Sequence, residues 1–403
     1  MGRRNLAVIR RFTMGLRYLT AGESHGAALT GILEGMPSGV EVVPECFASL
    51  LRRRRAGYGR GARQKIETDE VTVTAGLRAG YTTGAPIALQ IGNAEFTSPG
   101  ADGVSLAAHD QSSAIHVPLP GHADLPGIVK YGLSDCRNIR ERASARETVM
   151  RTALSVPPRC LLEALEVRSL CLVECLGGIT ASIDYNQSPA ALAELIAAGG
   201  DDFMTPDLAI IQSWKRLVDS AASDNASLGG TAAVIFWNLP IGLGSHTQHD
   251  LRLDSRLAGL LMSIPAVRGV EIGMALQQAS GDCPAADPIA YDSKNGWSRM
   301  TNYAGGLEGG MSNGAPLLLR FHMKPLPANA RVDSVDLRSG QLAQPEFYRS
   351  DTQAITAAAV VAESIIAIEL ASQLVKMTGG ETLQQVSARL ARLREEQKRL
   401  PGS

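Results

Sequence analysis

The longest apolar stretch of the chain runs from residue 354 to 375 and limits the folds open to it. A helix over this stretch is long enough to cross a bilayer. However, Glu363 and Glu369 lie inside it, and an ionisable side chain near the bilayer centre costs about 3 kcal/mol. The sequence therefore predicts a helix buried in the core of a cytoplasmic protein that makes no membrane contact.

The composition argues against several classes of function. Of the 403 residues, 45% are hydrophobic, which is enough for a substantial core. Aromatic residues make up 4% and the formal net charge is -1, so neither a base-stacking platform nor a general basic surface for nucleic acid is expected. The six cysteines include no Cys-x-x-Cys pair, and we interpret them as reduced core thiols.

Predicted strands and helices follow one another in mixed order. Strands are expected at 71–74, 86–91, 232–237 and 316–323, and helices at 45–55, 138–154, 251–263 and 353–375. Regular βαβ spacing and a Rossmann glycine fingerprint are both missing, which favours an α+β fold. We expect a disordered or extended segment at 1–15, a single domain at 16–378 and a charged helix or tail at 379–403.

Six arginines fall between residues 51 and 63, in Leu-Arg-Arg-Arg-Arg-Ala-Gly-Tyr-Gly-Arg-Gly-Ala-Arg. Guanidinium groups pair well with carboxylate and phosphate, and the glycines let the backbone approach a ligand. Arg52 and Arg53 are also explained as cations at a helix C-terminus. Arg60 and Arg63 lie beyond that helix and favour an anion site, although a polyanion-binding protein would use the same residues.

A second arginine-rich segment spans residues 140 to 151. On a helix, Arg142 and Arg146 would share a face, and Glu147 with Arg151 would form a surface ion pair. Taken alone, this segment is typical of an exposed helix with salt bridges.

Two histidines lie in short segments of small residues, outside any apolar periodic stretch. They are His25, in Gly-Glu-Ser-His-Gly, and His122, in Pro-Gly-His-Ala-Asp. A histidine in such a setting can reach a ligand as a general acid or base. Residues 22–26 also match the Gly-x-Ser-x-Gly pattern of a serine hydrolase, but the glycines and proline that follow leave a long helix doubtful. His246 and His249 lack a third ligand, so no metal site is predicted.

Three polar segments follow in the C-terminal half. The glycine-rich loop 305–314 precedes a predicted strand and could form an anion-binding nest. Lys324 follows that strand as a fixed cation, and Arg349 with Asp351 lies just before the long apolar helix.

In this order, the segments resemble those of chorismate synthases, and the resemblance covers residues 16 to 378. The matching segments are Gly-Glu-Ser-His-Gly, Arg-Arg-Arg-Ala-Gly-Tyr-Gly-Arg-Gly, Lys-Ile-Glu-Thr-Asp, Pro-Gly-His-Ala-Asp, Arg-Ala-Ser-Ala-Arg-Glu-Thr, Ser-Ile-Pro-Ala-Val-Arg-Gly-Val-Glu-Ile-Gly, Gly-Gly-Met-Ser-Asn-Gly and Arg-Ser-Asp-Thr. The resemblance implies an anti-1,4-elimination of phosphate from 5-enolpyruvylshikimate 3-phosphate that yields chorismate and requires reduced FMN.

The same resemblance implies roles for individual residues. His25 would protonate the departing phosphate, His122 would balance the charge on the reduced flavin, and Asp351 would assist proton removal there. The substrate would be bound by Ser24, Arg54 and Arg60. The residues expected at the FMN site are Arg142, Ala143, Ser144, Ala266, Gly309, Lys324, Pro325, Leu326, Pro327, Ala328 and Arg349.

The resemblance further implies helices sandwiched between antiparallel sheets and a homotetramer. Some members of the family reduce their flavin with NADP cofactors, although no dinucleotide fingerprint is visible here. The sequence departs from the family pattern in several places. They are Leu119 in place of an arginine, Met274 to Leu276 in place of Asp-Gly-Phe, Gln353 in place of a cysteine, Ile355-Thr356 in place of Val-Pro, and residues 329–332. A phosphate hydrolase and a catalytically degenerate family member are the alternatives.

Overall fold

The structure is a computed structural model that describes residues 15–61, 69–94, 96, 114–327, 332–346 and 351–400. The strands are β1 (Arg17–Ala21), β2 (Ala28–Glu34), β3 (Val71–Ala75), β4 (Leu77–Arg78), β5 (Tyr81–Thr82), β6 (Ile87–Gly92), β7 (Arg168–Leu176), β8 (Ile179–Thr180), β9 (Gly230–Trp237), β10 (Val267–Ile272), β11 (Ile289–Asp292), β12 (Gly296–Arg299), β13 (Leu307–Glu308), β14 (Met311–Ser312), β15 (Leu317–Met323), β16 (Ser334–Val335) and β17 (Leu342–Ala343). The helices are α1 (Pro44–Arg55), α3 (Asp124–Tyr131), α4 (Arg137–Arg140), α5 (Glu147–Leu154), α6 (Val156–Ala164), α7 (Pro189–Gly199), α8 (Ile211–Ser223), α9 (Leu253–Met262), α10 (Ala275–Ser280), α11 (Ile355–Thr378) and α12 (Leu383–Gln397).

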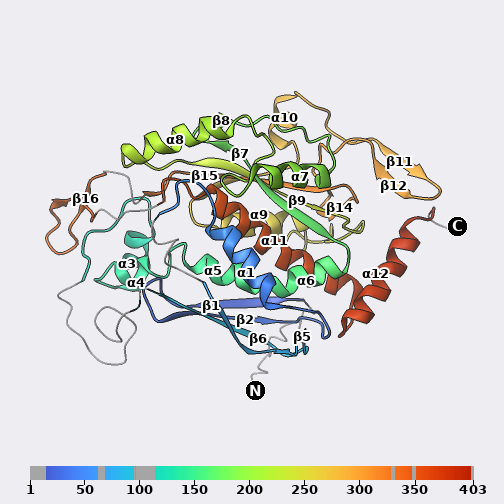
Figure 1. Cartoon of the computed structure of the whole chain (residues 1–403), viewed down its shortest axis with the longest axis horizontal. Helices are drawn as coiled ribbons and strands as arrows, with labels where there is room; N and C mark the ends of the chain where they lie inside the picture. Colours follow the sequence, from blue (N-terminus) through green and yellow to red (C-terminus); the bar gives the residue numbers. More distant parts are fainter. Residues whose placement is uncertain are drawn as a thin grey trace, which may run out of the picture.

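Two antiparallel sheets enclose a layer of helices (Figure 1). One sheet has the strand order β1-β2-β6-β3 and the other has the order β10-β15-β9-β7-β8. Helices α1, α5, α6 and α11 lie between them. The predicted α+β sandwich with helices between antiparallel sheets is therefore confirmed.

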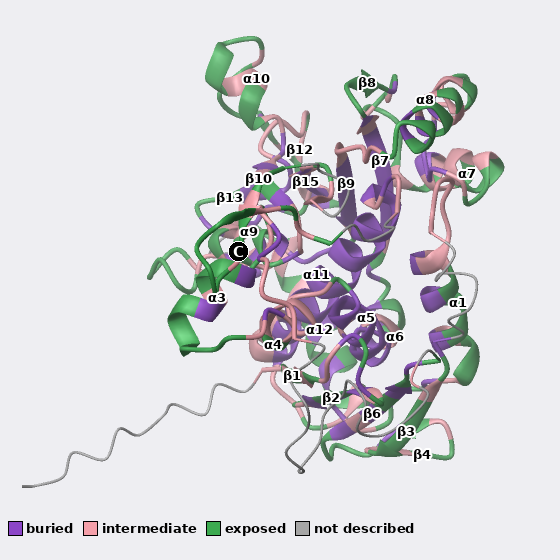
Figure 2. Ribbon diagram, turned by 90° about the vertical axis from the view of Figure 1, so that its left-hand side faces the viewer, coloured by how far each residue is buried: buried purple, intermediate pink, exposed green. Residues whose placement is uncertain are grey.

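Helix α11 forms the centre of the core, as its unbroken apolar sequence predicts. It qualifies as a membrane span by length and composition, yet 94% of its most apolar window is buried inside the protein (Figure 2). It packs on α1, α5, α6 and α9 and on strands β7 and β9. A helix that is apolar on every side needs such a surrounding of other elements.

The two carboxylates of α11 are neutralised inside the core. Glu363 is 1% exposed and ion-paired with Arg53 and Arg159, each at 3.1 Å. Ser169 Oγ also donates a 2.6 Å hydrogen bond to it. Glu369 is paired with Arg256. Partners from four other elements therefore allow charged groups in an otherwise apolar helix.

Helix α5 packs closely on the first sheet at Gly31 of β2. A Cβ at this position would lie 2.6 Å from Met150 Sδ and 2.7 Å from a Leu154 methyl carbon. Both of those side chains are fully buried. The small residue therefore sets how closely α5 lies to β2.

The helix predicted at 138–154 is interrupted. Residues 141–146 form turns between α4 and α5, and their carbonyls serve other elements. Glu141 O accepts from Ser24 N, and Ala145 O accepts from Arg54 Nη2. These tertiary contacts replace helical hydrogen bonds, so Arg142 and Arg146 do not share one helix face as expected.

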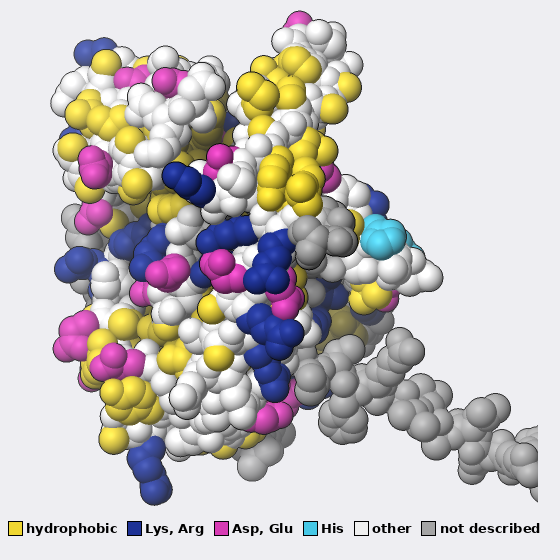
Figure 3. All heavy atoms as spheres, turned by 90° about the vertical axis from the view of Figure 1, so that its right-hand side faces the viewer, with side chains coloured by type: hydrophobic (Ala, Val, Ile, Leu, Met, Phe, Trp, Pro, Cys, Tyr) yellow, Lys and Arg dark blue, Asp and Glu magenta, His cyan; other side chains and the backbone are white. Residues whose placement is uncertain are grey.

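Helix α12 covers the edge of the sandwich and corresponds to the charged C-terminal segment. Val386 and Leu390 on its inner side are buried. The space-filling view of this side of the molecule shows acidic side chains among the basic ones (Figure 3). This mixture agrees with the net charge of -1 and gives no support to a general polyanion-binding surface.

Candidate active site

His25 lies on the tight loop that joins β1 to β2. The loop starts at Gly22, whose φ of +116° favours glycine and whose Cβ would lie 2.6 Å from Ala28 O. His25 is exposed, and its Nδ1 lies 3.0 Å from the Oγ of buried Ser24. A strand precedes the loop, as a nucleophile elbow requires, but a second strand follows it where the elbow needs a helix. The serine hydrolase alternative therefore loses its structural support.

Two residues outside the His25 loop, Glu141 and Asn93, hold it in place. Ser24 N donates to Glu141 O at 3.3 Å, and His25 N donates to the carboxylate of Glu141 at 3.4 Å. Asn93 donates to Gly26 O and Glu23 O. Burial raises the pKa of Glu141, and the charge of His25 opposes that rise. The loop is thus held through its backbone, which leaves the imidazole exposed.

His122 is oriented by a buried carboxylate. Its Nδ1 lies 2.7 Å from Asp124 Oδ1, and Asp124 is fully buried. Arg140 donates to Asp124 Oδ2 from Nε at 2.9 Å and from Nη2 at 2.6 Å, and Leu119 N donates to the same oxygen. Burial alone would raise the pKa of Asp124, but the bonds from His122 and Arg140 outweigh it and hold that pKa below its ordinary value.

This arrangement fixes which ring nitrogen of His122 is available. An ionised Asp124 accepts a hydrogen bond from Nδ1–H, so Nε2 is left for a ligand. Leu119, which replaces the expected arginine, is buried and contributes its backbone N–H. The cation beside Asp124 is Arg140, a residue to which the sequence analysis gave no role.

The two histidine loops are linked through consecutive residues. Arg140 holds the His122 side through Asp124, and Glu141 holds the His25 loop. On the other side, Lys324 Nζ donates to Gly121 O at 3.0 Å. The structure therefore connects both predicted histidines and the predicted cation Lys324 through direct contacts.

Arg54 is a buried cation at the last turn of α1. Its side chain is 5% exposed, and its Nη2 donates to Ala145 O at 3.1 Å and to Thr148 Oγ1 at 2.9 Å. Burial lowers its pKa to about 10, with Asp69 opposing and Arg60 and Arg146 reinforcing the shift. Its Nε has no hydrogen-bond partner among the described residues.

Arg60 lies on the loop after α1 and is paired with Asp351. The ion pair measures 2.7 Å, and Gly61 N donates to the same carboxylate at 2.6 Å. Burial lowers the pKa of Arg60, and Asp351 opposes that effect. The Nε of Arg60 is also buried without a hydrogen-bond partner in the part of the chain that the structure describes. A contact between the predicted substrate residue Arg60 and the predicted catalytic residue Asp351 was not foreseen.

The loop that carries Arg60 is fixed by one of the departures from the family pattern. Gln353 is fully buried, and its Nε2 donates to Tyr58 O at 2.8 Å. Thr352 N donates to Gly59 O at 3.0 Å. The side chain that replaces the usual cysteine therefore anchors the backbone just before Arg60.

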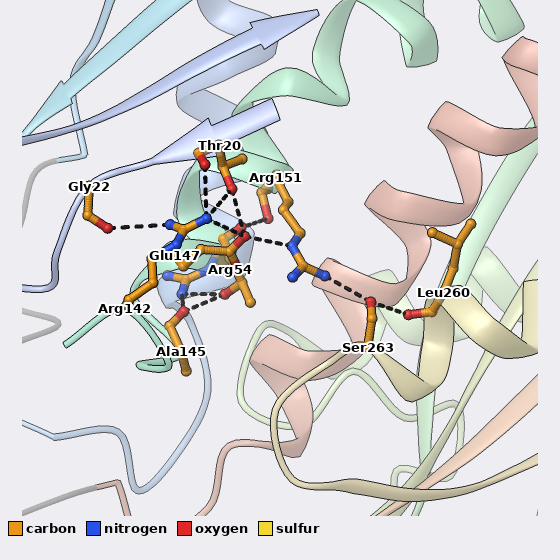
Figure 4. Close-up of polar contacts among 11 residues, drawn as sticks. Thr20, Gly22, Arg54, Arg142, Ala145, Glu147, Arg151, Leu260 and Ser263 are labelled. Atoms are coloured by element: carbon orange, nitrogen blue, oxygen red, sulfur yellow. Dashed lines mark hydrogen bonds and ion pairs between the residues drawn. The ribbon is translucent and has the colours of Figure 1, made fainter. Parts of the chain in front are cut away.

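Arg142 and Arg146 point to different partners. Arg142 donates to Thr20 O at 2.9 Å, to Thr20 Oγ1 at 2.8 Å and to Gly22 O at 3.3 Å, which ties it to the end of β1 (Figure 4). Glu147 beside it accepts from Arg151 at 2.8 Å. Glu147 is buried, so the expected surface pair is a pair inside the protein. Arg142 is thus bound to Thr20 and Gly22 at the start of the His25 loop.

Arg146 belongs to a buried group that the sequence analysis did not single out. Its Nη1 pairs with Asp69 Oδ1 at 2.5 Å, and its Nε donates to Asn93 Oδ1 at 3.0 Å. Asp69 is buried and adopts a positive φ of 53°. Asp69 is the last residue of the Lys-Ile-Glu-Thr-Asp segment. The resemblance of that segment to the family pattern was the one sequence signal that pointed to Asp69. Asn93 carried no signal, because single asparagines at strand ends are common.

The residues expected at the cofactor site fall into three groups. Ala266 O accepts from Lys324 N, and a Cβ on Gly121 would lie 3.3 Å from Pro327, so the segment from Lys324 through Pro325 and Leu326 to Pro327 approaches the His122 loop. Ala143 and Ser144 lie in the turn after α4, where Ser144 Oγ accepts from Arg146 N. Gly309 is in the β13–β14 turn, and no described atom lies within 4 Å of its Cβ position. Ala328 and Arg349 lie outside the described residues.

These contacts are typical of a site that binds an anion beside a histidine. Burial and the charges of Arg60 and Arg146 lower the pKa of Arg54, and the charges of Asp69 and Asp351 oppose that effect. Arg146 is linked to the loop of exposed His25 through Asn93, which donates to Gly26 O. Such a site suits an enzyme that acts on a small polyanion with the help of a proton-transferring side chain.

Comparison with known proteins gives the family. The family model described as chorismate synthase matches residues 16–375. Among curated relatives, the chorismate synthase of Desulforamulus reducens is 44% identical, covering 93% of this chain and 97% of its own length. That of Trichlorobacter lovleyi is 42% identical, with 92% and 96% covered. A crystal structure of a chorismate synthase matches with a TM-score of 0.77 at 32% identity, covering 95% and 98% of the two chains. The chain belongs to the chorismate synthase family.

Proposed function

We propose that the protein eliminates phosphate from 5-enolpyruvylshikimate 3-phosphate to give chorismate, in the pathway to aromatic amino acids. The reaction breaks one carbon–oxygen bond and one carbon–hydrogen bond, so the protein is a carbon–oxygen lyase. Membership of the chorismate synthase family supports this activity. The observation that carries it at the site is the buried group of arginines beside the His25 loop.

Arg54 and Arg60 bind the anionic groups of the substrate. Each has a buried Nε without a partner among the described residues, and a buried donor left without a partner costs about 1–3 kcal/mol. A carboxylate or phosphate oxygen would satisfy both groups and offset the repulsion that Arg60 and Arg146 exert on Arg54. Ser24, which is buried beside His25, adds a hydroxyl at the same loop.

His25 donates the proton that the departing phosphate needs. Its imidazole is exposed while its backbone is held by Glu141, so the ring can approach a ligand without moving the loop. Protonation of a leaving group in the transition state is typical general acid catalysis.

The residues around His122 fit the electron-rich cofactor that the family uses. Reduced FMN, when bound, supplies the electron density that helps to expel phosphate and remove an unactivated hydrogen. Lys324, Ala266, Pro325, Leu326, Pro327 and His122 approach one another in this structure and would hold it, with Arg142, Ala143, Ser144, Gly309, Ala328 and Arg349 as further expected contacts. Fixed cations and a histidine with a free Nε2 suit an anionic ring and a phosphate.

Asp351 is the remaining proposed proton acceptor. Its carboxylate is held by Arg60 and by Gly61 N, and Arg60 is one of the two arginines proposed to bind the substrate.

We propose that the protein works in the cytoplasm as a homotetramer, without nucleic-acid or membrane partners.

Turnover under anaerobic conditions tests this function. Purified protein, reduced FMN and 5-enolpyruvylshikimate 3-phosphate are expected to release phosphate and chorismate together, and oxidised FMN is expected to support neither. Phosphate release without flavin would favour a hydrolase. A lack of turnover with reduced FMN, while the folded protein still binds the substrate, would identify a degenerate family member.

A further inference from the structure

Two of the six cysteines lie across a helix interface away from the candidate active site. Cys46 is in the first turn of α1, and Cys160 is in the middle of α6, which packs on α1. Both thiols line one cavity of about 300 Å³, together with Arg53 and Arg159. Both are half-buried, whereas Cys136 and Cys171 are buried. A small reagent can therefore reach the pair.

The two thiols interact across the cavity that they line. Burial raises the pKa of Cys160 to about 12, and the charge of Cys46 and a hydrogen bond between the two side chains add to the rise. The proton is therefore retained on Cys160. Since the thiolate is the nucleophile in thiol chemistry, Cys46 is the thiol of this pair that reacts first.

We propose that Cys46 and Cys160 form an oxidisable dithiol, which a peroxide converts into a disulfide that joins α1 to α6. In the first step the sulfur of Cys46 attacks one peroxide oxygen, the O–O bond breaks, and a sulfenic acid and one water form. In the second step the sulfur of Cys160 attacks that of Cys46, the S–O bond breaks, and a second water leaves. Two thiols are oxidised, and one hydrogen peroxide is reduced to two waters.

The other cysteines lack this arrangement. Cys171 and Cys175 are four residues apart on strand β7, so about 13 Å of extended chain separates their Cα atoms. A disulfide needs Cα atoms within about 7 Å of each other. Burial raises the pKa of Cys136 to about 11 and also raises the pKa of Cys171. Cys283 is half-buried, and burial raises its pKa.

Peptide mapping of the native full-length protein tests the proposal. After mild hydrogen peroxide treatment and blocking of remaining thiols, trypsin digestion without reductant is expected to yield peptide 160–168 linked to peptide 18–52. The linked species should weigh two hydrogen atoms less than the two peptides together. Thiol titration of the unfolded protein should fall from six to four, and dithiothreitol should restore all six.

Matched variants separate this pair from general oxidation. Cys46→Ser and Cys160→Ser should each abolish the linked peptide, whereas Cys283→Ser should retain it. The linked chain should migrate as a single chain on a denaturing gel without reductant. Six remaining thiols, a link to any other cysteine, a link between chains, or a stable sulfenic acid on Cys46 would each overturn the proposal. The mapping of the unmodified sequence decides the matter even where a variant fails to fold.

Discussion

The imidazole of His122 is held by a carboxylate that is itself held by an arginine. This chain of contacts, from His122 through Asp124 to Arg140, fixes the tautomer and the direction of the ring. His25 has a different setting, because its ring is exposed, its Nδ1 lies 3.0 Å from Ser24 Oγ, and its backbone is held by Glu141. His122 is therefore oriented by a buried carboxylate, whereas His25 presents an exposed ring.

Replacing His122 tests its role. His122→Ala is expected to lower kcat by roughly 10- to 1,000-fold, as for loss of a general acid–base group. His116→Ala is the matched control, because His116 lies in the same segment and its ring Nδ1 lies 3.0 Å from Ser134 O. Unchanged kcat in His122→Ala, or an equal loss in the control, would contradict the role proposed for His122.

Arg54 should act on substrate binding more than on the cofactor. Arg54→Ala removes a buried cation and is expected to raise the substrate KM by roughly 10- to 100-fold, corresponding to about 1.5–3 kcal/mol for a charged hydrogen bond. FMN affinity should change less. Arg52→Ala, an exposed cation on the same helix, should leave both nearly unchanged. A larger loss of FMN affinity than of substrate affinity would place Arg54 on the other ligand.

The sequence identified residues that lie in recognisable segments and missed those that support them. His25, His122, Arg54 and Arg60 stand out because glycines or neighbouring arginines flank them. Asn93 and Arg140 act through contacts between distant segments, at sequence separations of 67 and 16 residues. Local patterns carry no information on such pairs, so only the structure could place them.

Among the elements, α11 was the most predictable and the segment between α4 and α5 the least. Helix α11 makes its backbone hydrogen bonds internally, and its apolar side chains need only burial. Its local sequence was therefore enough to predict it. Residues 141–146 would continue a helix by propensity, but Ser24 and Arg54 take up the carbonyls of Glu141 and Ala145. Tertiary hydrogen bonds outweighed local preference at the position where the candidate site is built.

Glu363 ties α11 to α1 and α6 and should make stability depend on acid pH. Burial would raise its pKa, but Arg159 and Arg53 lower it from 4.5 to about 2. A depressed pKa in the folded state stabilises the protein above the unfolded pKa, so this contribution is complete above about pH 4.5 and is lost as the pH falls towards 2. The shift corresponds to about 3 kcal/mol.

Denaturant unfolding of Glu363→Gln checks this prediction. At pH 7 the free energy of unfolding should fall by about 3 kcal/mol, and the difference from the original protein should shrink between pH 4.5 and 2. Glu34→Gln is the surface control, because the Arg17–Glu34 pair is 62% and 46% exposed and should contribute less than about 1 kcal/mol. A difference that does not depend on pH would contradict the role of the ionised carboxylate.

At the scale of the whole molecule, the sandwich brings segments from both halves of the chain to one site. The first sheet supplies the His25 loop, α1 and its following loop supply Arg54 and Arg60, and the end of β15 supplies Lys324. The family resemblance predicted this architecture, whereas mixed element order alone predicted only the α+β class. Sheet order and register depend on long-range pairing, which single-sequence patterns do not encode.

The assembly state is a prediction at this scale. Light scattering of the purified protein is expected to give four times the chain mass of 42.6 kDa. The value should hold over a range of protein concentrations. A mass equal to one chain at concentrations that support turnover would contradict the proposed homotetramer.

The central claim is that the buried arginines beside the His25 loop bind the anionic groups of the substrate. A crystal structure with 5-enolpyruvylshikimate 3-phosphate bound tests it most directly. We predict carboxylate or phosphate oxygens within hydrogen-bond distance of the Nε atoms of Arg54 and Arg60, with the phosphate facing His25. A substrate bound elsewhere, with both Nε atoms still lacking an anion, would contradict the account.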